Sequence, residues 1–256
     1  MSGTGTSFCT VMREDEYRRL DEVDESLWWL VGLRQLILGL IARHGPGQNT
    51  TLLDAGCGTG GMLKCIGAAF PQVELHGLDY AADACAFARE KTRAAIRCGS
   101  VSTLPYPDAS FDVLVSLDVL SSDSLEPGQV IGEFRRVLRP GGVLLLNLPA
   151  YQWLLSYHDR AVHQSRRFTV GGVRDLLQAA RLPVLQISYW NTLLFPLMVL
   201  RRKVWPEGTG ESDVQALPNL ANALFGAPLG VERALISSGV TLPFGGSVVS
   251  VARKES

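Results

Sequence analysis

The chain has 256 residues, 46% of them hydrophobic and 19% charged, which is enough for one sizeable core. Its 24 basic and 25 acidic side chains give a net charge of −1, and this balance argues against a nucleic-acid-binding face. The longest apolar run, Leu193–Leu200, is too short to cross a bilayer, and the start of the chain lacks the pattern of a secretory signal. Five cysteines without a Cys-x-x-Cys pair predict neither a disulfide scaffold nor a metal site, so we expect a cytoplasmic protein.

Two helical stripes open the chain. Apolar residues recur at helical spacing from Leu20 to Val31 and again from Leu33 to Ile41. The turn-forming segment Gly45-Pro46-Gly47 ends the second stripe. Residues 1–47 are therefore predicted to form an N-terminal pair of helices.

The next hundred residues alternate between short apolar runs and helical stretches. The predicted strands are Thr51–Ala55, Val73–Asp79, Ala95–Cys98, Phe111–Leu117 and Val143–Leu148. The predicted helices between them are Gly60–Phe70, Ala82–Arg93 and Gln129–Leu138, and the turn 139–142 precedes the fifth strand. Strands that alternate with helices indicate an α/β fold with a parallel sheet covered on both faces.

The last hundred residues are less regular. A loop at 151–168, rich in aromatic and basic residues, leads to a predicted helix at 170–181 and a strand at 184–189. Residues 191–240 then form an insertion with two predicted helices, at 193–205 and 220–236. The alternating pattern of Gly246–Arg253 predicts a final strand.

The strongest motif is LLDAGCGTGG at residues 52–61, an apolar strand that runs into alternating glycines before a helix. Gly56, Gly58 and Gly60 permit a tight turn and let a ligand approach the backbone. Asp54 directly precedes the turn, where a carboxylate would repel a pyrophosphate but attract an ammonium or a sulfonium. Asp79 ends the next strand, where an acid can accept both hydroxyls of a ribose.

Four ordered segments, LLDAGCGTGG, LHGLDY, LPYPDASFDVLVS and EFRRVLRPGGVLLL, resemble the class I S-adenosylmethionine-dependent methyltransferases. The similarity is to the small-molecule type related to the ubiquinone and menaquinone methyltransferases, and it is close over about residues 50–150. It implies a Rossmann-like, doubly wound sheet of seven strands whose last strand is antiparallel. It also implies a cofactor domain at 48–190 and 241–256, an N-terminal helical lid at 1–47, and a helical insertion at 191–240 that caps the acceptor side.

The resemblance also assigns roles to individual residues, with S-adenosyl-L-methionine as cofactor. The three glycines would pass beneath its methionine part. The other predicted contacts are Asp54 at the amino end, Asp79 at the ribose, Tyr80 on the adenine face, and Leu117 and Asp118 beside the sulfonium. Where the family often has an acid facing the adenine amino group, this chain has Ser100 followed by Val101. Arg34 would pair with the methionine carboxylate and Trp29 would belong to the lid, although both side chains also fit a purely structural role.

The acceptor side is predicted from the aromatic and apolar residues at 151–168 and 193–205, which favour a small apolar or ring-containing acceptor. His158 and His163 are the candidate general bases, and the alternative is that they only order the loop. Membrane contact through 193–205 is a less favoured alternative to core packing, a pocket wall or a subunit contact.

The sequence leaves two other functions open. The chain would bind the cofactor without transferring methyl if it is a partner subunit or a cyclase-like homologue. A nicotinamide-dependent oxidoreductase is disfavoured by Asp54 and by the lack of a Tyr-x-x-x-Lys pair.

Overall fold

A computed structural model describes residues 27–45, 47, 50–155, 164–204 and 219–255. The strands are β1 (Thr51–Ala55), β2 (Glu74–Asp79), β3 (Ala95–Cys98), β4 (Phe111–Leu117), β5 (Leu138–Pro149), β6 (Val184–Trp190) and β7 (Ser247–Arg253). The helices are α2 (Trp28–His44), α3 (Gly61–Ala69), α4 (Ala82–Lys91), α5 (Pro127–Val137), α7 (Val170–Ala179), α8 (Phe195–Val204) and α9 (Asn219–Ser237). Two short 3₁₀ helices are η1 (Val119–Ser121) and η2 (Gln152–Leu154).

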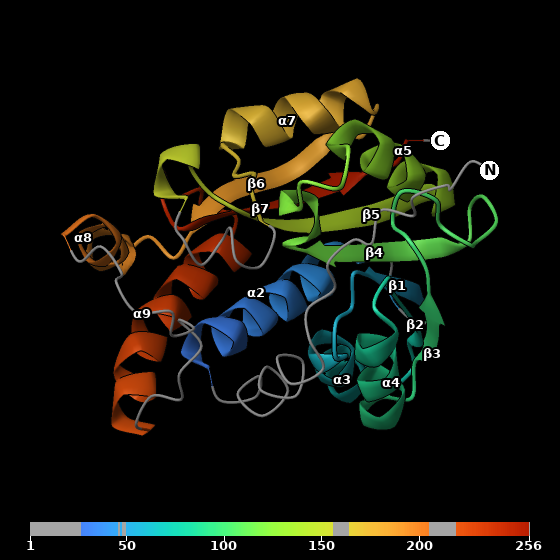
Figure 1. Cartoon of the computed structure of the whole chain (residues 1–256), viewed down its shortest axis with the longest axis horizontal. Helices are drawn as coiled ribbons and strands as arrows, with labels where there is room; N and C mark the ends of the chain where they lie inside the picture. Colours follow the sequence, from blue (N-terminus) through green and yellow to red (C-terminus); the bar gives the residue numbers. More distant parts are fainter. Residues whose placement is uncertain (1–26, 46, 48–49, 156–163, 205–218, 256) are drawn as a thin grey trace, which may run out of the picture.

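The strands form one seven-stranded sheet in the order β3-β2-β1-β4-β5-β7-β6 (Figure 1). The pairs among β1 to β5 are parallel, and β7 runs antiparallel to both β5 and β6. This confirms the predicted doubly wound sheet with an antiparallel last strand. The carboxyl ends of β1, β2, β4, β5 and β6 consequently meet at one edge, where open α/β sheets bind their ligands.

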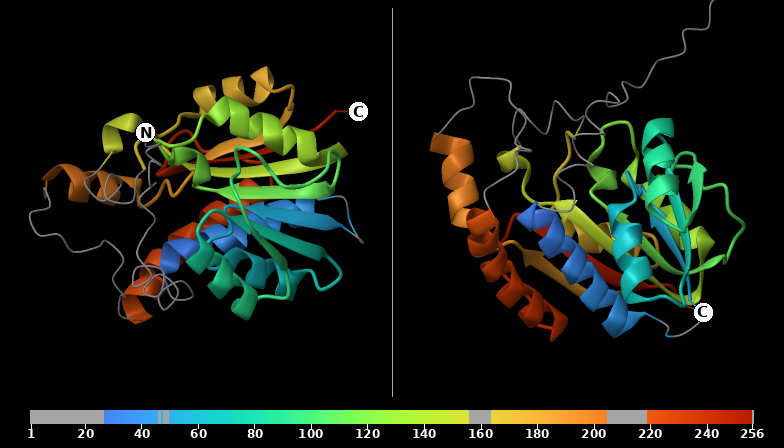
Figure 2. Two further views of the ribbon diagram at one scale, coloured as in Figure 1. Left: turned by 45° about the vertical axis from the view of Figure 1, so that its right-hand side comes forward. Right: turned by 90° about the horizontal axis from the view of Figure 1, so that it is seen from below.

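Helices cover both faces of the sheet, with α5 and α7 on one side and α2, α3 and α9 on the other (Figures 1 and 2). Side chains of β1 alternate between the two layers. Leu53 and Ala55 belong to the α5–α7 core, whereas Leu52 belongs to the α2–α3–α9 core. The same alternation turns the side chain of Asp54 toward α2 and α3.

The structure differs from the predicted elements in two places. A single helix, α2, runs through the second N-terminal stripe and the last residues of the first, and the rest of the first stripe lies outside the described residues. The strand β5 begins at Leu138, the last residue of a predicted helix, and runs through the predicted turn 139–142, because Leu138 pairs with Phe111 before the register shifts. Within the described ranges, no helix combines the length and apolar character needed to cross a membrane.

Candidate functional site

The turn after β1 is built from glycines with left-handed backbones. Gly56, Gly58 and Gly60 have φ values of +89°, +52° and +85°. A Cβ at Gly56 would lie 2.1 Å from the Val119 side chain, and one at Gly60 would lie 3.0 Å from Ala88. Gly58 differs, because no atom of the described residues lies within 4 Å of where its Cβ would stand. Packing thus excludes a side chain at Gly56, while Gly58 leaves open space above the turn.

Asp79 holds this turn in place from the end of β2. Its Oδ2 accepts a hydrogen bond of 2.9 Å from the Gly58 N–H, and its Oδ1 accepts one of 3.0 Å from the Ala81 N–H. Burial raises the pKa of Asp79, and the backbone N–H groups of Ala81, Gly58 and Tyr80 counteract that rise. The carboxylate therefore lies beside the glycine turn, as predicted for a ribose contact. Tyr80, next to it, is 56% exposed.

Asp54 of β1 and Arg34 of α2 interact electrostatically. Both are buried, and the charge of Arg34 acts on Asp54. The pKa of Asp54 is raised from 3.8 to about 7, chiefly by burial and also by the charge of Asp79, while the charge of Arg34 opposes the rise. The predicted arginine thus faces the predicted acid. Trp29 lies in the first turn of the same helix and is partly buried.

The adenine side of the predicted site has a serine in place of the usual acid. Ser100 is exposed, and its Oγ accepts a hydrogen bond of 3.1 Å from the Ser102 N–H. Val101 is buried in the α5–α7 core. The serine hydroxyl therefore has a turn-forming role of its own, which sequence reasoning did not foresee.

The end of β4 carries the last two predicted contacts. Leu117 and Asp118 are both partly buried. The Asp118 Oδ1 accepts a hydrogen bond of 2.9 Å from the amide of Asn147, a residue of β5 that sequence reasoning missed. The available signal was a single polar residue within the otherwise apolar run 143–148, since a buried amide needs a partner.

The same edge of the sheet carries an aromatic cluster: Tyr151, Trp153, Tyr189, Phe195 and Phe244. Tyr151 stacks on Tyr189 with ring centroids 5.1 Å apart, and Phe195 lies 5.7 Å from Tyr151 and 5.7 Å from Phe244. Trp153 is 50% exposed and Phe244 is 41% exposed. The predicted bases His158 and His163 lie outside the described residues, so the cluster is the described part of the predicted acceptor side.

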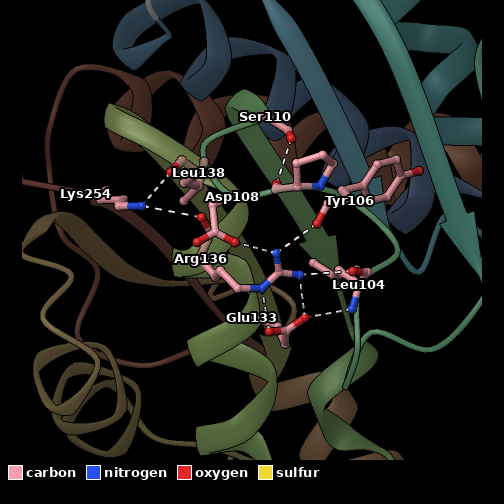
Figure 3. A network of polar contacts seen from close by, with 9 residues as sticks. Leu104, Tyr106, Asp108, Ser110, Glu133, Arg136, Leu138 and Lys254 are labelled. Carbon is pink, nitrogen blue, oxygen red and sulfur yellow. Dashed lines mark hydrogen bonds and ion pairs between the residues drawn. The ribbon is translucent and has the colours of Figure 1, made fainter.

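Two of the four ordered segments are joined by polar contacts away from this edge (Figure 3). Arg136 of α5 donates to the carboxylates of Glu133 and Asp108 and to the carbonyls of Leu104 and Tyr106, at 2.8 to 3.0 Å. These bonds employ all five N–H donors of the guanidinium. Arg136 therefore fastens the 104–108 loop, which precedes β4, to α5.

The donor set fits S-adenosyl-L-methionine. Two buried carboxylates, Asp54 and Asp79, adjoin a backbone turn with open space above Gly58. Carboxylates suit a ligand with a ribose diol and an ammonium, and they disfavour a pyrophosphate.

Comparison with known proteins agrees with this fit. Residues 53–146 match a family described as "Methyltransferase domain". A probable S-adenosylmethionine-dependent methyltransferase of Mycolicibacterium smegmatis is 40% identical over 127 residues, which are 49% of this chain and 47% of that protein. The demethylmenaquinone methyltransferase of Deinococcus radiodurans is 35% identical over 120 residues, or 45% of this chain and 48% of that protein. The matched segments thus span about half the length of these curated relatives.

A solved structure shares the fold. Phosphoethanolamine N-methyltransferase 2 of Haemonchus contortus, in complex with S-adenosyl-L-methionine, superposes with a TM-score of 0.64 at 16% identity, covering 97% of this chain and 59% of that one. The domain match and the relatives agree with each other, and the strand order agrees with the fold of the solved methyltransferase. Residues 53–146 of this chain thus match the methyltransferase domain family, and the chain is similar over about half its length to S-adenosylmethionine-dependent methyltransferases.

Proposed function

We propose that this protein transfers a methyl group from S-adenosyl-L-methionine to a small acceptor that is apolar or carries a ring. The observation that carries the proposal is the pair of buried carboxylates, Asp54 and Asp79, beside the open turn at Gly58. When bound, the cofactor supplies a methyl group on a positively charged sulfur, which an acceptor nucleophile takes by in-line displacement.

The chain's own residues bind and orient the donor. The Asp79 carboxylate accepts hydrogen bonds from the ribose hydroxyls. Asp54 attracts the ammonium of the methionine part, and Arg34 attracts its carboxylate. Tyr80 offers an exposed ring for the adenine face. Holding two reactants in line removes most of the entropic barrier to the reaction, so alignment is the main catalytic task of such a site.

The aromatic cluster supports the class of acceptor. Its half-exposed rings, Trp153 and Phe244, lie at the edge of the sheet that also carries the glycine turn. Aromatic side chains bind apolar and ring-shaped molecules through large contact areas and offset stacking. The relative from Deinococcus radiodurans, whose name specifies demethylmenaquinone, is consistent with a ring-containing acceptor.

A general base is needed only if the acceptor must lose a proton. His158 and His163 are the proposed bases, because a neutral imidazole takes a proton near neutral pH. Replacement of each histidine by alanine tests this role. Undiminished turnover in both variants would remove the histidines from the mechanism.

The first experiment is thermal unfolding with S-adenosylhomocysteine, with NAD as the control ligand. A ligand at 100 times its dissociation constant adds about 2.7 kcal/mol, a rise of several degrees in Tm. We expect this rise with S-adenosylhomocysteine alone, and its loss in Asp79→Ala. A response to NAD instead would support the oxidoreductase alternative.

The second experiment is a transfer assay with methyl-labelled cofactor and a panel of acceptors: a hydroquinone, a sterol, a long-chain fatty acid and a phenol. Transfer to a member of this panel is the expected result. Binding of S-adenosylhomocysteine without transfer to any of them would favour the non-transferring homologue.

A further inference from the structure

Two cysteines, Cys85 of α4 and Cys98 of β3, lie beside each other where the helix packs on the edge strand of the sheet. The Cys85 sulfur is 3.4 Å from the carbonyl oxygen of Asp79 and 3.6 Å from that of Arg97, the residue that precedes Cys98. The two thiols also interact directly, and both are free in this structure. A bond between their sulfur atoms would therefore join α4 to β3.

The two thiols have different surroundings. Cys98 is exposed, and Arg89, one helical turn after Cys85, donates to the Cys98 sulfur at 3.5 Å. A guanidinium bonds more strongly to a sulfur anion than to a neutral thiol, and the thiolate is the form that reacts. Cys85 is buried, and its pKa is raised to about 12, chiefly by burial and also by the neighbouring Cys98 thiol. An accessible thiol beside a second, resolving thiol is the arrangement of cysteines that respond to oxidants.

The cysteine pair borders the candidate site. The Asp79 backbone accepts from the Cys85 thiol, and the carboxylate of the same residue holds the glycine turn. Two predicted adenine contacts flank the pair in sequence, because Tyr80 precedes α4 and Ser100 follows β3. A disulfide would remove the Cys85 S–H donor from the Asp79 carbonyl and would pull the start of α4 toward the end of β3. Oxidation would thus displace backbone on both sides of the predicted adenine position.

We propose that Cys98 and Cys85 form a peroxide-sensitive dithiol, and that its oxidation to a disulfide weakens ligand binding at the neighbouring glycine turn. The effect on binding rests on the proposed function, because it assumes that S-adenosyl-L-methionine occupies the turn. The formation of the disulfide does not depend on that assumption.

The oxidation has two steps. The Cys98 sulfur attacks hydrogen peroxide and breaks its O–O bond, which leaves a sulfenic acid on Cys98 and releases one water. The Cys85 sulfur then attacks the Cys98 sulfur, the S–O bond breaks, and the hydroxyl leaves as a second water with the proton of the Cys85 thiol. The two thiols together lose two electrons, and one peroxide is reduced to two waters.

The first test is a peptide map of the full chain after treatment with hydrogen peroxide. Free thiols are blocked, and trypsin digestion without reductant places Cys98 in the peptide 98–135 and Cys85 in the peptide 65–89, which also contains Cys65. We expect these two peptides to be linked in the unmodified chain and in Cys65→Ser, and to separate in Cys85→Ser and in Cys98→Ser. The absence of a link, or a link that persists in Cys85→Ser, would overturn the proposal.

The second test is calorimetric binding of S-adenosylhomocysteine before oxidation, after it, and after reduction with dithiothreitol. The unmodified chain should bind about fivefold or more weakly when oxidised and recover when reduced. The matched control is Cys65→Ser in α3, which removes a partly buried thiol and should respond like the unmodified chain. Cys98→Ser should keep its affinity throughout. A disulfide that leaves the affinity unchanged would overturn the effect on binding. Failure of the reduced, unmodified chain to bind would refute the proposed function itself, while the peptide map still decides whether the disulfide forms.

Discussion

At the scale of single residues, Gly56 and Gly58 share a left-handed backbone but have different surroundings. We predict that Gly58→Ala costs about 1–2 kcal/mol of stability for the strained φ. Its methyl group would enter the open space above the turn, so the affinity for S-adenosylhomocysteine should fall about tenfold or more. Urea unfolding and calorimetry measure the two effects separately.

The control for this substitution is Gly132→Ala in α5. Gly132 is exposed, and among the described residues no atom lies within 4 Å of its would-be Cβ. Alanine there should stabilise the helix by up to about 1 kcal/mol and leave binding unchanged. Full binding by Gly58→Ala would show that the ligand does not cross the turn at this glycine.

Asp54 predicts a pH dependence of cofactor binding. Its pKa is raised to about 7, chiefly by burial, so the ligand-free protein holds this carboxyl protonated below that pH. Binding of an ammonium requires the carboxylate, and the affinity for S-adenosylhomocysteine should fall about tenfold for each pH unit below 7. Calorimetry in two buffers of different ionisation enthalpy should show release of a proton on binding. The same slope in Asp54→Asn would contradict this assignment.

The same carboxyl also makes stability depend on pH, but in the opposite direction: binding should strengthen as the pH rises, whereas stability without ligand should fall. An unfolded chain releases this proton near the ordinary pKa of 3.8, whereas the folded, ligand-free protein retains it up to about pH 7. The folded state then binds more protons, so the contribution of Asp54 to stability falls as the pH rises from about 4 to about 7. Ligand that pairs with the ionised carboxylate offsets this loss.

At the scale of elements, local pattern predicted the strands well. The bounds of β1, β3 and β4 agree with the predicted ranges, because each is a short apolar run between turn signals. The start of β5 was mispredicted, since the Arg-Pro-Gly-Gly sequence at 139–142 indicates a turn although its backbone continues the strand. Pairing with β4 determines where β5 begins, and the local sequence does not encode that pairing.

The grouping of the candidate site residues was predictable where a motif marks them, as at Asp54, Asp79 and the glycines, which the structure brings together after β1 and β2. It was not predictable where a residue acts through another residue. Asn147 and Trp190 lie 43 residues apart in sequence and meet only because β7 pairs with both β5 and β6. Arg34 was placed through resemblance, and its electrostatic interaction with Asp54 depends on how α2 packs on the sheet.

Arg136 shows how one side chain can fasten a loop to a helix. We predict that Arg136→Lys destabilises the protein by about 2–3 kcal/mol. The lysine ammonium has only three N–H donors and cannot replace the five donors of the planar guanidinium. Hydrogen exchange should become faster at residues 104–110. The matched control is Asp108→Ala, which removes a partner whose side chain is 78% exposed and should cost less than about 1 kcal/mol. Equal costs for both variants would mean that the surface ion pair dominates.

At the scale of the whole molecule, the described parts of 191–240, the predicted insertion, pack against the sheet and the N-terminal helix. A Cβ at Gly32 would lie 2.6 Å from Leu229, so α2 and α9 approach closely (Figure 2). The buried carboxylate of Glu232 accepts bonds of 2.9 and 2.7 Å from the N–H groups of Thr192 and Leu193, at the start of the insertion. The helix α9 thus covers α2 and anchors the segment that leads to α8.

This packing predicts that the insertion cannot be removed as a separate cap. Trp190 pairs with Ser247, so a short turn can replace residues 193–243 without altering the β6–β7 pair. The deletion also removes the buried Leu229 and Ile236 from the core, and the loss of each should cost at least about 2–5 kcal/mol. We expect the shortened chain to lose cooperative urea unfolding and to bind a dye specific for exposed apolar surface. The milder variant Ile236→Ala should cost about 2–5 kcal/mol. If the shortened chain instead keeps its unfolding midpoint and its S-adenosylhomocysteine binding, the insertion is a detachable cap. The face of α2 that packs against α9 would then have to be stable in water.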